Sequence, residues 1–179
     1  MVDNTTAAID ILKNILDEVP TILTNSTPNF NNIINTQITN STIGNLDGIL
    51  GNFTNISSII IDNNNNYLYV ADNYSYSIRR IEISTNFTKT IAGYYTETNF
   101  SPSSGISTGD GIDTRFNNIK KIVLTNDNKF LIILDNLINL SRILIMELTT
   151  EHFFVSTLYQ HDSIPINDIR LDKFDDKII

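Results

Sequence analysis

The feature that most constrains the fold of this chain is an internal repeat. The segment Phe53–Asp62 (FTNISSIIID) aligns with Phe116–Thr125 (FNNIKKIVLT), and a third copy begins at Ile166 (INDIRLD). Each copy leads through a polar turn to an apolar run, at 67–72 (YLYVAD), 130–135 (FLIILD) and 178–179 (II). Repeats at such intervals are typical of propellers and solenoids, because one copy can bury its apolar faces only against its neighbours.

The pattern within each copy predicts short antiparallel strands joined by turns rich in Asn, Asp and Gly. We expect two complete four-stranded sheets, or blades, at 56–94 and 119–160, and a next blade starting at 166. Residues 35–44 are expected to form the outer strand of a preceding blade. The individual strands are predicted at 56–62, 67–72, 77–84 and 88–94, and again at 119–125, 130–135, 141–149 and 153–160.

The residues before the repeats have a different pattern. Residues 1–20 are predicted to form an amphipathic helix that ends at Pro20 and that packs on a neighbouring surface or docks on a partner chain. Residues 21–34 are expected to be a polar connector to the repeat segment at 35–179. The apolar residues that recur at helical spacing are Ile9, Leu12, Ile15, Leu16 and Val19.

The first complete repeat contains LYVADN at 68–73 and IRRI at 78–81, and IAG at 91–93 is followed by GDG at 109–111. These residues resemble the NHL repeat family of β-propellers. The resemblance covers about residues 35–179, although the family's usual Pro-X-Gly before the innermost strand is absent. It implies an all-β fold, a partial NHL-like propeller of about two full blades plus partial ones.

Each blade carries an aspartate and an arginine at the same spacing, Asp72 with Arg79 and Asp135 with Arg142. In each pair the aspartate closes the second strand and the arginine opens the third. A guanidinium can donate two parallel hydrogen bonds to a carboxylate, so we expect each pair to fix the register of its hairpin. Recurrence once per blade favours this structural role over contact with a ligand.

Composition argues against most kinds of chemistry. The chain has no cysteine and two histidines, which excludes disulfides, zinc thiolates and cysteine nucleophiles. His152 and His161 are too far apart to form a helical metal pair. Asp110 and Asp113 suggest a calcium loop, but Arg115 and Phe116 follow instead of the ligands that such a loop needs. We therefore expect no catalytic residue, cofactor or metal site.

The net charge of −8 argues against nucleic acid as a partner, because no cationic surface is available to neutralise phosphates. The chain also has no apolar run of the roughly 20 residues that a membrane-spanning helix requires. Tyr74 and Tyr76 fall in the loop between the second and third strands of the first blade. Exposed tyrosines are favoured at protein interfaces, so both are candidate contacts with a partner.

The chain is Asn-rich and contains many Asn-X-Ser/Thr sequons. These favour an extracellular or cell-surface glycoprotein, and the alternative is a cytoplasmic protein in which the sequons arise by chance. Residues 1–20 lack the pattern of a signal peptide. The candidate glycosylation sites are Asn52, Asn73, Asn86, Asn99 and Asn139.

Two full and two partial blades cannot close a ring, since closed propellers have 4 to 8 blades. The chain is then a piece of a longer protein, a contributor to a ring completed by other chains, or an open arc in a larger assembly. The function expected is a non-catalytic module for protein–protein interaction or structural assembly, bound to a partner protein or to further blades. The alternative is a propeller enzyme of lyase or hydrolase type whose catalytic residues lie outside this segment.

Overall fold

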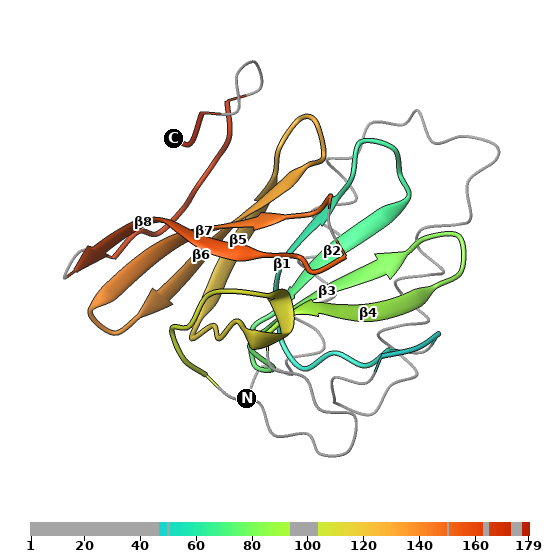
Figure 1. The fold of residues 1–179 in the computed structure, drawn as a ribbon, viewed down its shortest axis with the longest axis horizontal. Helices are drawn as coiled ribbons and strands as arrows, with labels where there is room; N and C mark the ends of the chain where they lie inside the picture. Colours follow the sequence, from blue (N-terminus) through green and yellow to red (C-terminus); the bar gives the residue numbers. More distant parts are fainter. Residues whose placement is uncertain (1–46, 50, 94–103, 150, 163–164, 173–176) are drawn as a thin grey trace, which may run out of the picture.

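The computed structural model describes residues 47–49, 51–93, 104–149, 151–162, 165–172 and 177–179 (Figure 1). The predicted helix at 1–20, the connector at 21–34 and the predicted strand at 35–44 lie outside the described residues.

The described chain forms two four-stranded antiparallel sheets, each with its strands in sequence order. This confirms the all-β fold and the two propeller-like blades that the repeats predict. The first sheet contains β1 (Ile56–Ile61), β2 (Tyr67–Asp72), β3 (Ser77–Glu82) and β4 (Phe87–Ala92). The second contains β5 (Ile119–Leu124), β6 (Phe130–Leu137), β7 (Leu140–Glu147) and β8 (Val155–Asp162), and a short 3-10 helix, η1 (Gly111–Asp113), lies between the sheets in sequence.

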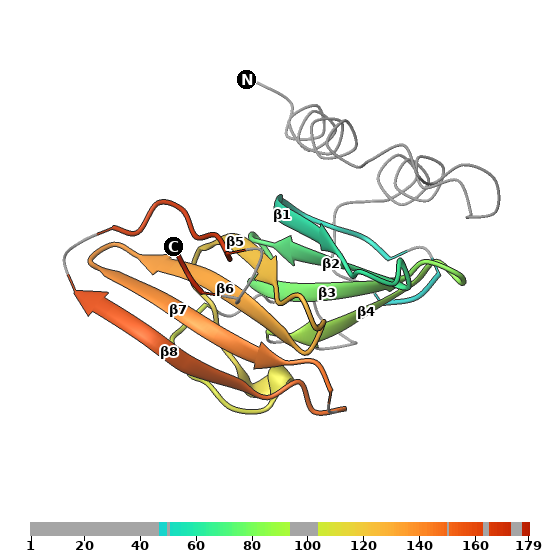
Figure 2. The ribbon, with the colours of Figure 1, turned by 90° about the horizontal axis from the view of Figure 1, so that it is seen from above.

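The two sheets fan out from their first strands, and β1 lies beside β5 (Figure 2). Alternate residues along each strand point to opposite faces of a sheet, so one face of each sheet is available to cover the other. The largest apolar cluster fills the space between them. It includes Tyr69, Ala71, Ile78 and Ile91 from the first sheet and Ile122, Leu131, Ile133, Leu144 and Val155 from the second.

The third copy of the repeat covers the other face of the second sheet. Ile169 is 1% exposed and belongs to an apolar cluster with Ile132 and Leu134 of β6. Leu171 forms an antiparallel bridge with Ile178, and the backbones of Arg170 and Ile179 exchange hydrogen bonds of 3.0 and 2.9 Å. Each copy of the repeat thus covers the apolar side of the copy before it.

Equivalent turns of the two sheets lie next to each other. The β1–β2 turn and the β5–β6 turn each contain an asparagine with positive φ, Asn65 at 57° and Asn128 at 60°. The Asn63 amide donates to Asn128 Oδ1 at 3.1 Å, and Asn63 Nδ2 donates to the Asn126 carbonyl at 2.7 Å. Since these turns share one end of the molecule, the β2–β3 and β6–β7 loops share the opposite end.

Candidate functional site

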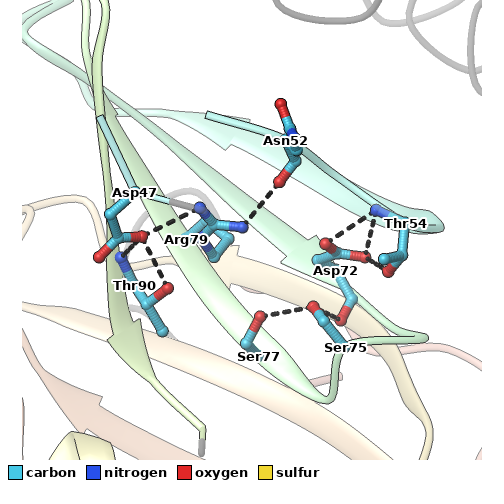
Figure 3. Close-up of polar contacts among 8 residues, drawn as sticks. All are labelled: Asp47, Asn52, Thr54, Asp72, Ser75, Ser77, Arg79 and Thr90. Atoms are coloured by element: carbon cyan, nitrogen blue, oxygen red, sulfur yellow. Dashed lines mark hydrogen bonds and ion pairs between the residues drawn. The ribbon is translucent and has the colours of Figure 1, made fainter. Parts of the chain in front are cut away.

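A buried polar cluster lies on the first sheet near its β2–β3 loop (Figure 3). The Arg79 side chain on β3 is fully buried, and its guanidinium donates from Nη2 to Asp47 Oδ1 at 3.0 Å and from Nη1 to the Asn52 carbonyl at 2.9 Å. Asp47 Oδ1 also accepts hydrogen bonds from the Thr90 amide and hydroxyl on β4, at 2.8 and 2.9 Å. The arginine therefore ties the segment before β1 to the middle of the sheet.

Asp72 has different partners from those predicted. Its buried carboxylate accepts hydrogen bonds from the Thr54 backbone amide at 3.0 Å and from the Thr54 hydroxyl (Figure 3). The Asn55 amide also donates to this carboxylate, at 2.8 Å. The predicted Asp72–Arg79 pair is wrong, because Arg79 makes its ion pair with Asp47.

The predicted pair does form in the second sheet. Arg142 Nη2 donates to Asp135 Oδ2 at 2.5 Å, and both side chains are almost completely buried. Asp135 also accepts from the amides of Asn117 and Asn118, at 3.0 and 2.7 Å. Arg142 further donates to the carbonyl of Ile106 at 2.7 Å, so it holds the loop before β5 as Arg79 holds the segment before β1.

The difference between the sheets follows from the length of one turn. In the second sheet Leu137 pairs with Leu140 around a two-residue turn, which places Asp135 directly opposite Arg142. In the first sheet Asp72 pairs with Ser77 around the longer loop 73–76, so Arg79 lies opposite Val70 instead. The aspartate and arginine are equally spaced in sequence, but the hairpin register decides whether they meet.

These four side chains carry out a structural task. Each is buried and is hydrogen-bonded to the segment that leads into the first strand of its own sheet. Buried charges are tolerated when they are paired and hydrogen-bonded, and such groups then restrict the backbone around them. These four side chains therefore fix the loops at the end of each sheet.

The candidate contact residues in the 73–76 loop differ in exposure. Tyr74 is 61% exposed, whereas Tyr76 has a φ of 51° and packs partly against the apolar cluster between the sheets. Sequence reasoning missed Ile138, which is 98% exposed in the β6–β7 turn. The tip of a two-residue hairpin turn is exposed to solvent. The sequence around Ile138 does not predict such a turn, because it lacks the usual Asn-Gly or Asp-Gly pair.

The candidate glycosylation sites are also unequal. Asn139 is exposed beside Ile138, and Asn86 is half-buried at a turn position with a φ of 61°. Asn52 is 8% exposed, and Asn73 Nδ2 donates to Asn118 Oδ1 of the second sheet at 3.1 Å. Asn99 lies outside the described residues. A glycan can be attached only to an accessible amide nitrogen. Because Asn52 is buried, it is no longer a candidate glycosylation site.

Metal ligands do not gather in the part of the chain that the structure describes, where no three His, Asp or Glu side chains form a group. Asp110 Oδ2 lies 3.9 Å from His152 Nδ1, and both side chains are at least half exposed. In the loop that contains Asp110 and Asp113, Arg115 donates to the carbonyls of Ile112 and Thr114 at 3.0 and 2.9 Å. The described residues also include no helix that is long and apolar enough to cross a membrane.

Comparison with known proteins gives weak matches. No protein-family model and no curated protein matches the chain. Among solved structures, an auxiliary nutrient binding protein from Bacteroides thetaiotaomicron is 18% identical, with a TM-score of 0.41 over 51% of this chain and 23% of that one. A structural genomics protein of unknown function from the same organism is 15% identical, with a TM-score of 0.45 over 69% of this chain and 26% of that one. The chain therefore spans about a quarter of the length of these two proteins.

Proposed function

We propose that the chain is a segment of an NHL-like β-propeller that serves as a non-catalytic module for protein–protein interaction or structural assembly. One observation carries the proposal: two equivalent loops present large exposed side chains at one end of the molecule. These are Tyr74 in the β2–β3 loop and Ile138 in the β6–β7 turn. The other end carries the β1–β2 and β5–β6 turns, which are hydrogen-bonded to each other.

The rigid framework beneath the loops supports this function. The residues that precede and follow the β2–β3 loop are fixed by Asp72 and by the hydroxyls of Ser75 and Ser77, which lie 2.7 Å apart (Figure 3). Ser75 also donates to the Asp72 carbonyl at 3.1 Å. A loop that is already ordered loses little conformational freedom when a partner binds, so more of the contact energy appears as affinity.

The proposal is tested by immobilising the full chain, capturing proteins that bind to it, and measuring how tightly each captured partner binds to variants of the chain. The variants Tyr74→Ala and Ile138→Ser are expected to weaken binding of a specific partner by tenfold or more, as loss of a central interface residue usually does. The variant Phe154→Ala is the matched control, because Phe154 is 50% exposed and lies at the opposite end of the second sheet, where its carbonyl accepts from the Glu147 amide at 3.0 Å. A partner that binds all three variants equally, or turnover of a substrate by the chain alone, would contradict the proposal.

We also propose that the module is extracellular and glycosylated. We expect the exposed sequon asparagines to carry glycans and the buried ones to remain unmodified. Mass spectrometry of the protein from its natural source is expected to find a glycan on Asn139, which is exposed, and none on Asn52, which is 8% exposed. The variant Asn139→Gln should remove that mass. Unmodified Asn86 and Asn139 would contradict the extracellular location, and a glycan on Asn52 would contradict the packing described for it.

A further inference from the structure

The face of the first sheet that packs against the second sheet has a buried half and an exposed half. On β4, Ile91 lies in the cluster between the sheets, whereas Lys89 and Phe87, on the same face, are exposed. The exposed half contains a partly open cavity of about 200 Å³. Its lining residues are Tyr67, Arg80, Glu82, Phe87 and Lys89.

Two like charges face each other in this cavity. Arg80 on β3 lies directly opposite Lys89 on β4 in the register of the sheet. Like charges at opposed positions of a β-sheet are destabilising. Yet the chain carries a net charge of −8, so carboxylates are plentiful. Within the described part of the chain, neither Arg80 nor Lys89 forms an ion pair with a carboxylate, and all of the ion pairs are made by other basic side chains.

Two aromatic rings pack on Arg80. Its guanidinium carbon lies 4.5 Å from the centroid of the Tyr67 ring and 5.0 Å from that of the Phe153 ring. Burial raises the pKa of nearby Tyr69 to about 12, against the opposing effect of Arg80, so the tyrosine hydroxyl stays neutral. A guanidinium that packs on ring faces keeps its in-plane donors for an anion.

Glu82 limits the kind of anion that fits. Its carboxylate accepts a hydrogen bond from the Thr85 hydroxyl at 2.6 Å, and it lies two residues from Arg80 on the same face of β3. The cavity therefore holds two positive charges and one negative charge, which favours a ligand with a single negative charge. Tyr67 and Phe87 provide ring surfaces, and a cavity somewhat smaller than this one accommodates benzene.

We propose that this cavity is a binding site for a small aromatic monocarboxylate, with its carboxylate against Arg80 and Lys89 and its ring against Tyr67 and Phe87. This site is separate from the exposed loops that carry the proposed interaction function. Binding relieves the repulsion between the two cations, because the carboxylate neutralises the charge between them. No bond is made or broken.

The test is an NMR titration of the full chain with benzoate. We expect saturable shifts confined to the resonances of 67–69 and 80–89, with a dissociation constant on the order of 1 mM or tighter. Lys89→Gln is expected to weaken binding by about tenfold to a hundredfold, since a hydrogen bond to a charged group is lost. Lys89 is exposed, so this variant should fold normally, and Lys120→Gln, at an exposed position on β5, is the matched control.

Three comparisons can overturn the inference. Benzyl alcohol has the same ring without the charge and should not saturate, and inorganic phosphate has charge without the ring and should bind more weakly than benzoate. Equal binding of either probe, or unchanged affinity in the Lys89→Gln variant, would show that the cavity does not recognise an aromatic carboxylate. Absence of saturable shifts with benzoate would overturn the site itself, and it would leave the loop-mediated interaction unaffected.

Discussion

Replacing Asp135 with asparagine is expected to destabilise the chain by about 3 to 5 kcal/mol, as breaking a buried ion pair usually does. Asp135 is completely buried and Arg142 is 2% exposed, so water cannot replace the lost charge. The aspartate also accepts hydrogen bonds from the amides of Asn117 and Asn118 through one oxygen. An asparagine can satisfy those amides or Arg142 in part, but it leaves the guanidinium without a counter-charge.

The free energy of unfolding measured by urea denaturation checks this expectation. The control is Asp127→Asn, since the Asp127–Lys129 pair is exposed on the β5–β6 turn, and exposed ion pairs contribute little to stability. The double variant Asp135→Leu with Arg142→Met should recover only part of the loss: both charges leave the interior together, but the amides of Asn117 and Asn118 and the carbonyl of Ile106 lose their partners. A loss for Asp135→Asn no larger than that of the control would mean that the pair is not buried as described.

The contrast between the two sheets shows what the sequence determines and what it leaves open. The strands were predictable because the alternation of apolar and polar residues and the turn residues between them are local signals, and both signals occur in each copy of the repeat. The partner of Arg79 was not predictable, because it depends on the register set by the 73–76 loop and on Asp47, which lies far away in sequence. The same spacing that pairs Asp135 with Arg142 separates Asp72 from Arg79.

The candidate binding sites depended even more on tertiary structure. Tyr74 and Tyr76 looked equivalent in sequence, but the positive φ of Tyr76 turns its backbone so that the side chain packs against the core between the sheets. The juxtaposition of Arg80 with Lys89 follows from the β3–β4 register. The exposure of Lys89 follows from where the second sheet stops covering the first, and no local pattern encodes that offset.

Replacing Gly111 with alanine is the second change expected to have a large effect. A Cβ atom at this position would lie 2.0 Å from the carbonyl oxygen of Ile91 on β4, far inside van der Waals contact. The obstacle is the backbone near the end of β4, and it cannot rotate away as a flexible side chain can. Inserting one methyl group into such a site costs about 1 to 3 kcal/mol, and more where the backbone must shift.

The position of Gly111 explains why the effect should spread to the contact between the sheets. Its amide donates to the His152 carbonyl at 2.9 Å, and its carbonyl accepts from the Gly93 amide at 2.9 Å, so it connects the end of β4 to the start of β8. Gly109 adds a bridge to Val155, with hydrogen bonds of 2.9 and 2.7 Å. The GDG sequence at 109–111 is thus the backbone link between successive blades.

Hydrogen exchange and thermal unfolding of Gly111→Ala measure both consequences. The variant is expected to melt at a lower temperature and to lose amide protection in β4 and at the start of β8, while the β2–β3 and β6–β7 ladders stay protected longer. Ile112→Ala is the matched control, because Ile112 is the next residue and is 61% exposed. Equal melting temperatures of the two variants would show that the backbone at Ile91 shifts easily to make room for the methyl group. The close approach of β4 to the 109–111 segment would then not hold the blades together.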